Sequence, residues 1–227
     1  MAAPPLRFEL ARIGQFQPHL PLLVSALLGL AAFAVVILSE LWSAAKHVDT
    51  IAHEGAHAIV GAAAGRRVIG VRMSGNGEGG TRLHPPTGPG YVLAGIAGYL
   101  GPSGFGLGAA ELIRMRHSVA VLWFALALLL ILLGPLRWSF GVASVTITGL
   151  VLYLIARYAS LGMQEVAAYV LAWLLLLTGV DTVLKHGTKA IDAGILKELT
   201  SLPRGFWRSL WLAGSLLALV VGARLLL

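Results

Sequence analysis

The chain has 227 residues, of which 57% are hydrophobic and 12% are charged, and its mean hydropathy is +0.82. Soluble globular domains carry about 25% charged and about 45–50% apolar residues, so the composition excludes a soluble protein and predicts a polytopic membrane protein. The absence of cysteine excludes disulfides and thiolate metal sites, and the net charge of +7 is expected in loops beside a membrane, with no nucleic-acid partner.

Seven apolar stretches predict membrane-spanning helices, because a span needs about 20 predominantly apolar residues. They cover residues 20–38, 41–65, 91–113, 119–136, 139–156, 163–180 and 206–222. The predicted fold class is therefore an all-α polytopic membrane protein, with about seven transmembrane helices in a single domain over residues 1–227. We expect the first span to be retained, since it is long and follows Arg7 and Arg12.

Residues 66–90 interrupt the spans and have a different pattern. Residues 68–73 favour a strand, residues 74–80 are typical of a turn, and residues 81–84 favour a second strand. The pattern predicts a small β-hairpin after the second span. The glycines are also compatible with a flexible loop, and the sequence leaves both interpretations open.

The later part of the chain contains two further unusual segments. The third span, residues 91–113, is rich in glycine and contains Pro102. Small residues allow helices to approach closely, and a proline inside a helix bends it. Residues 181–205 are polar and amphiphilic, and the last span, residues 206–222, follows them.

The lysines and arginines between the spans predict the side of the membrane that each loop occupies. With seven spans, one side holds the N-terminus, the hairpin and residues 181–205, and it carries more of these cations than the other side. This excess predicts that the N-terminus, the hairpin and residues 181–205 are all cytoplasmic.

The second predicted span, residues 41–65, contains a His-Glu-x-x-His sequence. In a helix, His53 and His57 project from one face, where two imidazoles can bind a Zn²⁺ ion. Glu54 lies beside them and can act as the base on a metal-bound water. Such residues can also hydrogen-bond between helices without a metal. Three ionisable groups in an apolar segment favour a functional site, because their burial is costly.

The ordered set of motifs resembles the site-2 protease-like family of membrane-embedded zinc metallopeptidases, and looks most like its compact bacterial branch. The similar segments are His-Glu-Gly-Ala-His-Ala at 53–58, Gly-Tyr-Leu-Gly-Pro-Ser at 98–103, and residues 191–200 followed by Pro203 and Trp207. The resemblance covers most of residues 45–215.

The resemblance implies a third zinc ligand, which in this family is an aspartate from a later segment. Motif similarity assigns this role to Asp192, which would complete a site with His53 and His57. Asp181, at the end of the sixth span, is the alternative, and His186 is a weaker candidate.

The resemblance also implies an activity, namely hydrolysis of peptide bonds in or near transmembrane segments of substrate proteins in the bacterial cell membrane. Glu54 would activate the zinc-bound water, and the hairpin would offer a strand edge to the substrate. Two alternatives are a catalytically silent membrane binding or regulatory protein, and a metal or proton transporter. An intact Glu54 argues against the first, and the lack of internal repeats argues against the second. The sequence indicates neither the substrate nor the oligomeric state.

Overall fold

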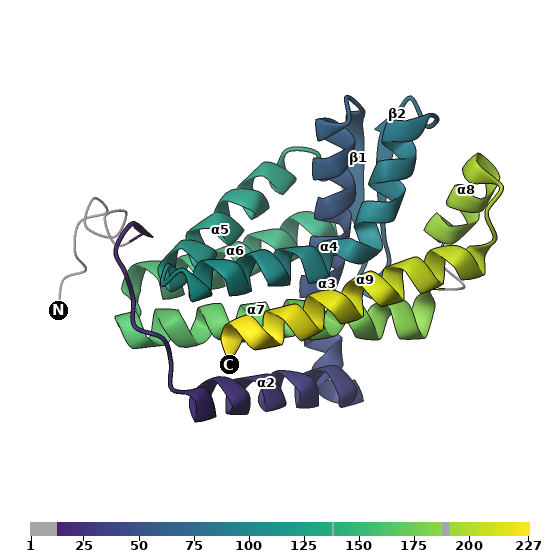
Figure 1. The fold of residues 1–227 in the computed structure, drawn as a ribbon. Coiled ribbons are helices and arrows are strands. Elements are labelled where there is room, and N and C mark those ends of the chain that lie inside the picture. The colour runs from purple at the N-terminus through teal and green to yellow at the C-terminus, as the bar shows by residue number, and fades with distance from the viewer. Residues whose placement is uncertain (1–12, 138, 188–190) are drawn as a thin grey trace.

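The computed structural model describes residues 13–137, 139–187 and 191–227 (Figure 1). In these residues the chain forms, in order, α2 (Leu22–Ile37), α3 (Ser39–Ala63), β1 (Arg67–Met73), β2 (Gly79–His84), α4 (Pro89–Arg114), α5 (Ser118–Leu133), α6 (Ser139–Tyr158), α7 (Leu161–His186), α8 (Ile191–Thr200) and α9 (Arg204–Leu226). Arg7 and Arg12, on which part of the predicted charge distribution depends, lie outside the described residues.

Each predicted span coincides with a helix, and α8 is an additional short helix. By length and composition, four of the described helices can cross a membrane, namely α4, α6, α7 and α9. The helices α2 and α5 are apolar but have only 16 residues each. The prediction of a mostly helical membrane protein with a small hairpin is confirmed, whereas the count of seven spans stays a prediction.

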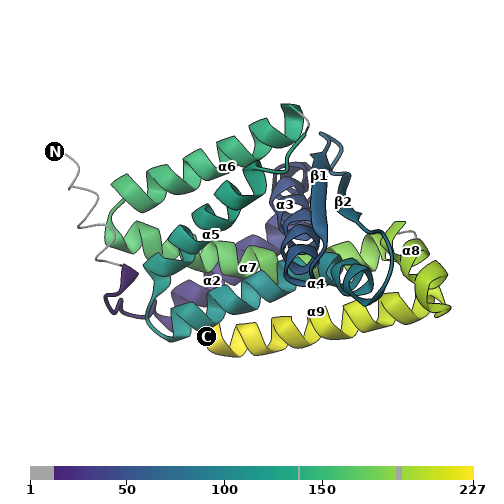
Figure 2. The same cartoon turned by 90° about the horizontal axis from the view of Figure 1, so that it is seen from above.

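The helix α3 and the first part of α4 run across the common direction of α2, α5, α6, α7 and α9 (Figures 1 and 2). The helix α4 bends midway, and it contains Pro102. A proline lacks the backbone N–H and clashes with the preceding turn, which accounts for the bend. As a result, α4 packs against α3 as well as against α7 and α9.

The strands β1 and β2 form the predicted antiparallel hairpin, with Val71 opposite Thr81. One edge of the hairpin is covered, because the Val71 N–H donates to the Pro135 carbonyl at 2.9 Å and the Val71 carbonyl accepts from the Arg137 N–H at 3.1 Å. The other edge, along β2, has no backbone partner among the described residues. The hairpin therefore has a single open edge in the described part of the chain.

A buried cluster holds α8 against α4 and α9. Its members are Tyr99, Val183, Ala193, Leu196, Trp207 and Trp211. Burial of a leucine side chain such as that of Leu196 contributes about 1.5–3 kcal/mol. The Trp211 indole N–H also donates to the Ile96 carbonyl oxygen at 3.1 Å, which ties α9 to α4. These contacts position the first turn of α8 beside α3.

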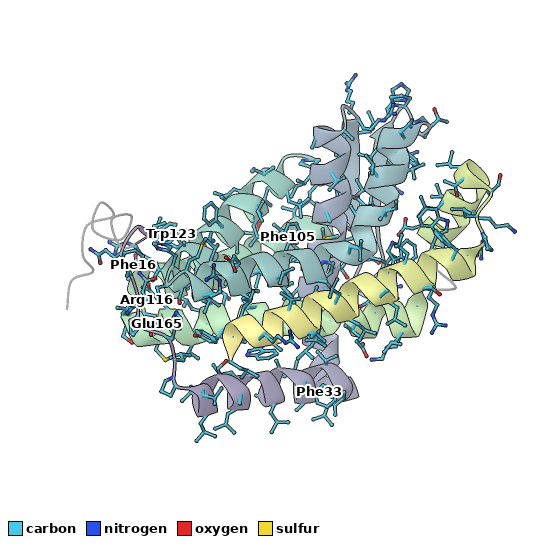
Figure 3. The ribbon with its side chains drawn as sticks, in the orientation of Figure 1. Phe16, Phe33, Phe105, Arg116, Trp123 and Glu165 are labelled. Carbon is cyan, nitrogen blue, oxygen red and sulfur yellow. The ribbon has the colours of Figure 1, made fainter. Side chains whose placement is uncertain are left out.

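The segment before α2 lies at the far end of α4. The Gln17 N–H donates to the Arg116 carbonyl oxygen at 2.8 Å, and the rings of Phe16 and His117 are 5.2 Å apart. Phe16 and Arg116 accordingly lie at the same end of the molecule (Figure 3), whereas Phe33 points outward from α2. The loop charges had predicted opposite sides of the membrane for these two segments. The contact corrects that arrangement, because two segments joined by hydrogen bonds share one side.

Candidate metal centre

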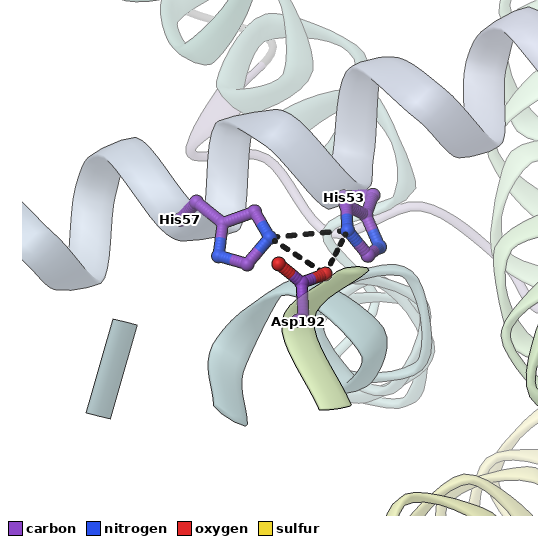
Figure 4. A group of neighbouring side chains, drawn as sticks. All are labelled: His53, His57 and Asp192. Carbon is purple, nitrogen blue, oxygen red and sulfur yellow. Dashed lines mark hydrogen bonds and ion pairs between the residues drawn. The ribbon is translucent and has the colours of Figure 1, made fainter. Parts of the chain in front are cut away.

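Two imidazoles from α3 and one carboxylate from α8 meet at a single point (Figure 4). The Nε2 atoms of His57 and His53 are 3.1 Å apart. The Oδ2 atom of Asp192 lies 3.3 Å from the His53 Nε2 and 3.5 Å from the His57 Nε2. Among the described residues, these three form a group whose ligand atoms all lie within 4.8 Å of one another.

The separations between the three atoms fit a tetrahedral metal ion. Zinc binds imidazole nitrogen and carboxylate oxygen at about 2.0–2.2 Å, so two ligands of a tetrahedral zinc lie about 3.3–3.6 Å apart. The observed separations of 3.1, 3.3 and 3.5 Å are close to this range. Three protein ligands leave one position open, which is the arrangement of catalytic zinc sites.

The backbone of α4 orients the imidazole of His57. The Nδ1 atom of His57 lies 2.7 Å from the carbonyl oxygen of Ala94. Because a carbonyl oxygen only accepts, Nδ1 carries the proton and Nε2 presents its lone pair to the metal position. One turn further along α4 stands Gly98, where a Cβ atom would overlap the His57 Nε2 and lie 2.9 Å from the His53 Nε2. The helix thus supplies both an orienting acceptor and the space for two imidazoles.

Asp192 reaches the histidines from the first turn of α8. Its Oδ2 atom faces the Nε2 atoms of both imidazoles. A carboxylate in its ionised form can bind a metal from this position.

The two other candidates for a third ligand are outside this group. Asp181 pairs with Lys185 of its own helix, with Oδ2 and Nζ 2.7 Å apart. His186 lines the cavity around the site but contributes no atom to the group of three. The geometry therefore favours Asp192 over Asp181, and its role as a ligand stays a prediction.

Glu54 is held by the hairpin. Its side chain is buried, and its Oε2 accepts a hydrogen bond from the Thr81 hydroxyl at 2.6 Å. Gly79 leaves room for it, since a Cβ atom at this position would lie 2.7 Å from the Glu54 carboxyl carbon. The carboxylate that the sequence predicts as a base is therefore fixed next to β2.

One cavity of about 920 Å³, between α3, β2, the first part of α4, the end of α7 and α8, is lined by the three grouped side chains together with Glu54 and Thr81. Asp49, one turn before His53, also lines it and is buried. The Thr182 hydroxyl donates to Asp49 Oδ2 at 2.8 Å. The volume lies within the range of about 300–1,000 Å³ that is usual for ligand pockets.

Sequence reasoning missed three contributors to this site, namely Thr81, Ala94 and Tyr99. The ring of Tyr99 packs edge-on against His53, with centroids 4.7 Å apart. No local pattern pairs Thr81 with Glu54 or Ala94 with His57, because each pair is far apart in the chain. The one available signal was the Gly-Tyr-Leu-Gly-Pro-Ser motif, which contains Tyr99.

Helices able to cross a membrane, together with a group of two imidazoles and a carboxylate that could hold a metal, fit the class of membrane metallopeptidases. A protein-family model described as Peptidase M50B-like matches residues 26–222, and the chain belongs to this family, which is the site-2 protease family. The match confirms the resemblance drawn from the sequence. Neither the curated proteins nor the solved structures include a match to this chain.

Proposed function

We propose that the protein is a zinc-dependent intramembrane endopeptidase of the bacterial cell membrane. Its substrates would be membrane proteins, cut in or near their transmembrane segments. The observation that carries the proposal is the meeting of His53, His57 and Asp192 beside a buried glutamate, in a member of a peptidase family.

The donor set supports zinc as the cofactor, held by His53, His57 and Asp192. Two neutral imidazoles and one carboxylate in a tetrahedral arrangement are typical of this ion. When bound, zinc would supply Lewis acidity, polarising the scissile carbonyl and lowering the pKa of water toward about 7.

Glu54 would act as the general base and then as the general acid. Its Oε2 is occupied by the Thr81 hydroxyl, which fixes the plane of the carboxylate and leaves the other oxygen to accept a proton from water. The same group then returns the proton to the leaving amine. Thr81 would be a positioning residue, because it acts through Glu54.

The open edge of β2 is an argument that the substrate binds in an extended conformation. The backbone N–H and carbonyl of Val71 bond to residues 135–137, so they point away from β2. Val71 and Thr81 are therefore an opposed pair that exchanges no backbone hydrogen bonds. In such a pair, the backbone N–H and carbonyl of Thr81 point to the outer edge of the hairpin. Thr81, on this edge, also contacts Glu54 through its side chain. A substrate helix hides its carbonyls in internal hydrogen bonds and must unwind before cleavage, so an edge that pairs with the unwound segment would offset part of the cost.

A Glu54→Gln variant tests the proposal. Purified wild type should contain one zinc per chain and cleave a panel of single-span membrane proteins in detergent or liposomes. The variant should keep its zinc, because glutamine preserves the shape of the side chain, and should lose cleavage by about 10²–10⁴-fold or more through loss of the base.

The alternatives give different results in the same experiment. A transporter would show metal or proton flux in liposomes and no cleavage in either form. A silent binding protein would show neither flux nor cleavage. A wild type without stoichiometric zinc would overturn the proposal.

A further inference from the structure

Peptide hydrolysis requires a partner for the charge that develops on the carbonyl oxygen. Water adds to the carbonyl carbon, the π electron pair moves onto oxygen, and a proton passes to the base. A preorganised hydrogen-bond donor at this oxygen contributes as much as 10²–10³-fold in kcat, roughly, in other hydrolases. In the proposed peptidase function, zinc would polarise this carbonyl, but no residue of the chain is assigned to donate a hydrogen bond to it. Any residue assigned to this role depends on that proposed function.

Tyr99 stands next to the metal position and is held firmly. Its ring stacks on Trp211, with centroids 4.4 Å apart, and meets the ring of His53 edge-on at 4.7 Å. Only 7% of the residue is exposed, yet it lines the cavity that holds the histidines and Glu54. Packing on two sides leaves the ring little freedom, so the hydroxyl is preorganised.

The Tyr99 hydroxyl is a donor that the described part of the chain leaves without a hydrogen-bond partner. A hydroxyl donor that has no acceptor of its own and stands beside a metal centre is available to a developing oxyanion.

The other hydroxyl groups of the cavity are less suited to this role. The Thr81 hydroxyl donates to Glu54, and the Thr182 hydroxyl donates to Asp49. The Thr50 hydroxyl is engaged by backbone carbonyl oxygens, those of Lys46 and Gly77, at 2.9 and 3.0 Å. Tyr91 lies on the same helix as Tyr99 but eight residues earlier, about 12 Å along an ideal helix axis. Tyr99 alone among these five combines contact with His53 and an uncommitted hydroxyl.

We propose that Tyr99 is a further catalytic residue, whose phenol donates a hydrogen bond to the scissile carbonyl oxygen as negative charge develops there. Tyr99 keeps its proton throughout, and Glu54 carries the proton that water loses. The hydrogen bond strengthens as charge moves onto the oxygen, so it favours the transition state over the bound substrate.

A Tyr99→Phe variant tests this proposal, because phenylalanine keeps the stacking on Trp211 and the contact with His53 and removes only the hydroxyl. We expect kcat to fall about 10²–10³-fold, with KM and zinc content unchanged. Tyr91→Phe is the matched control and should keep kcat within about threefold of wild type. A second measurement needs no turnover, namely binding of a phosphinic dipeptide that mimics the tetrahedral state. Its affinity should fall in Tyr99→Phe by about the factor lost in kcat.

The outcomes separate this proposal from the function on which it rests. A wild type that cleaves no membrane substrate overturns the proposed function and this role with it. A cleaving wild type with an equally active Tyr99→Phe variant overturns the role of Tyr99 alone. A variant that instead loses zinc, with phosphinic dipeptide affinity per bound zinc unchanged, shows that the tyrosine only supports His53, and it also overturns the role.

Discussion

At the scale of single residues, the site depends on glycine as much as on its ionisable groups. Gly98 faces both imidazoles, and Gly79 faces the Glu54 carboxylate. Neither position needs an unusual backbone conformation; each needs the absence of a side chain. A methyl group at either position would occupy space that a functional side chain fills, and well-packed surroundings respond to such overpacking with shifts that cost about 1–3 kcal/mol.

We predict that Gly98→Ala weakens zinc binding. The new methyl group would overlap the Nε2 of His57 and crowd that of His53, so both ligands must move away from the metal position. Changes that misorient a ligand cost about 10–100-fold in metal affinity, and displacement of two should reach the upper part of this range. Competition with a fluorescent zinc chelator measures the affinity.

Gly104→Ala is the control for this change. It lies on the same helix, and a Cβ atom there meets nothing within 4 Å. The control should bind zinc like wild type. Equal zinc affinity in Gly98→Ala and Gly104→Ala would contradict the placement of the two imidazoles against α4.

At the scale of elements, the hairpin has two unequal edges. The β1 edge is closed by residues 135–137, and the β2 edge, which contacts Glu54 through Thr81, is open among the described residues. This inequality changes how substrate pairing should be tested. Proline at Val71 would break the bond to Pro135 and disturb the fold, so a probe on β2 is more specific.

We predict that substrate adds to β2 as a strand. A cysteine at Gly80, where a Cβ atom has open space, should form disulfides with single cysteines placed along a substrate segment. Because side chains alternate along a strand, every second substrate position should crosslink. The Glu54→Gln background prevents cleavage during the experiment, and the natural chain adds no cysteine of its own.

Arg67→Cys, exposed on β1, provides the matched control and should give little crosslinking. Crosslinks at every third or fourth substrate position would indicate a helical substrate and would rule out strand addition. Equal crosslinking from both strands would show that the edge has no special role.

The helices and strands could largely be predicted from the sequence, but the tertiary contacts that bring them together at the site could not. Local pattern was enough for α3 and for the hairpin, because helical spacing and turn glycines act over a few residues. Asp192 came from motif similarity, and no pattern in the chain places it beside His53. Thr81 and Ala94 were missed because their partners lie 27 and 37 residues away, where only tertiary packing can join them.

At the scale of the whole molecule, the connections lie at two opposite ends. One end holds the segment before α2 and the loop after α4, joined through Gln17 and Arg116. The other end holds the hairpin and the α5–α6 connection, joined through Val71 and Arg137. Hydropathy measures the length of a helix and says nothing of its direction, so it did not show that α3 runs across the other helices (Figure 1).

This arrangement changes the predicted topology. Described cations are more numerous at the hairpin end, which includes Arg66, Arg67, Arg72, Arg82, Arg137, Lys185, Lys197, Arg204 and Arg208, than at the other end, which includes Arg114, Arg116, Arg157 and Arg224. Positive loops stay in the cytoplasm, so we expect the hairpin and residues 191–203 to be cytoplasmic. The segment around Gln17 should then be on the outer side, where the sequence alone predicted the inner one.

Single cysteines in this naturally cysteine-free chain test that topology. Thr87 and Glu198 are exposed at the hairpin end, and Gly162 is exposed in the first turn of α7, near the loop from α6, with open space around a Cβ atom. In intact spheroplasts, a membrane-impermeant maleimide should label Gly162→Cys and leave Thr87→Cys and Glu198→Cys unlabelled. In inverted vesicles the pattern should reverse.

Wild type, which should stay unlabelled in both preparations, is the control. Labelling of Thr87→Cys and Glu198→Cys from opposite sides would place the hairpin and α8 on different sides of the membrane. Glu54, held by the hairpin, and Asp192, on α8, could then not belong to one metal centre, and the proposed site would be wrong.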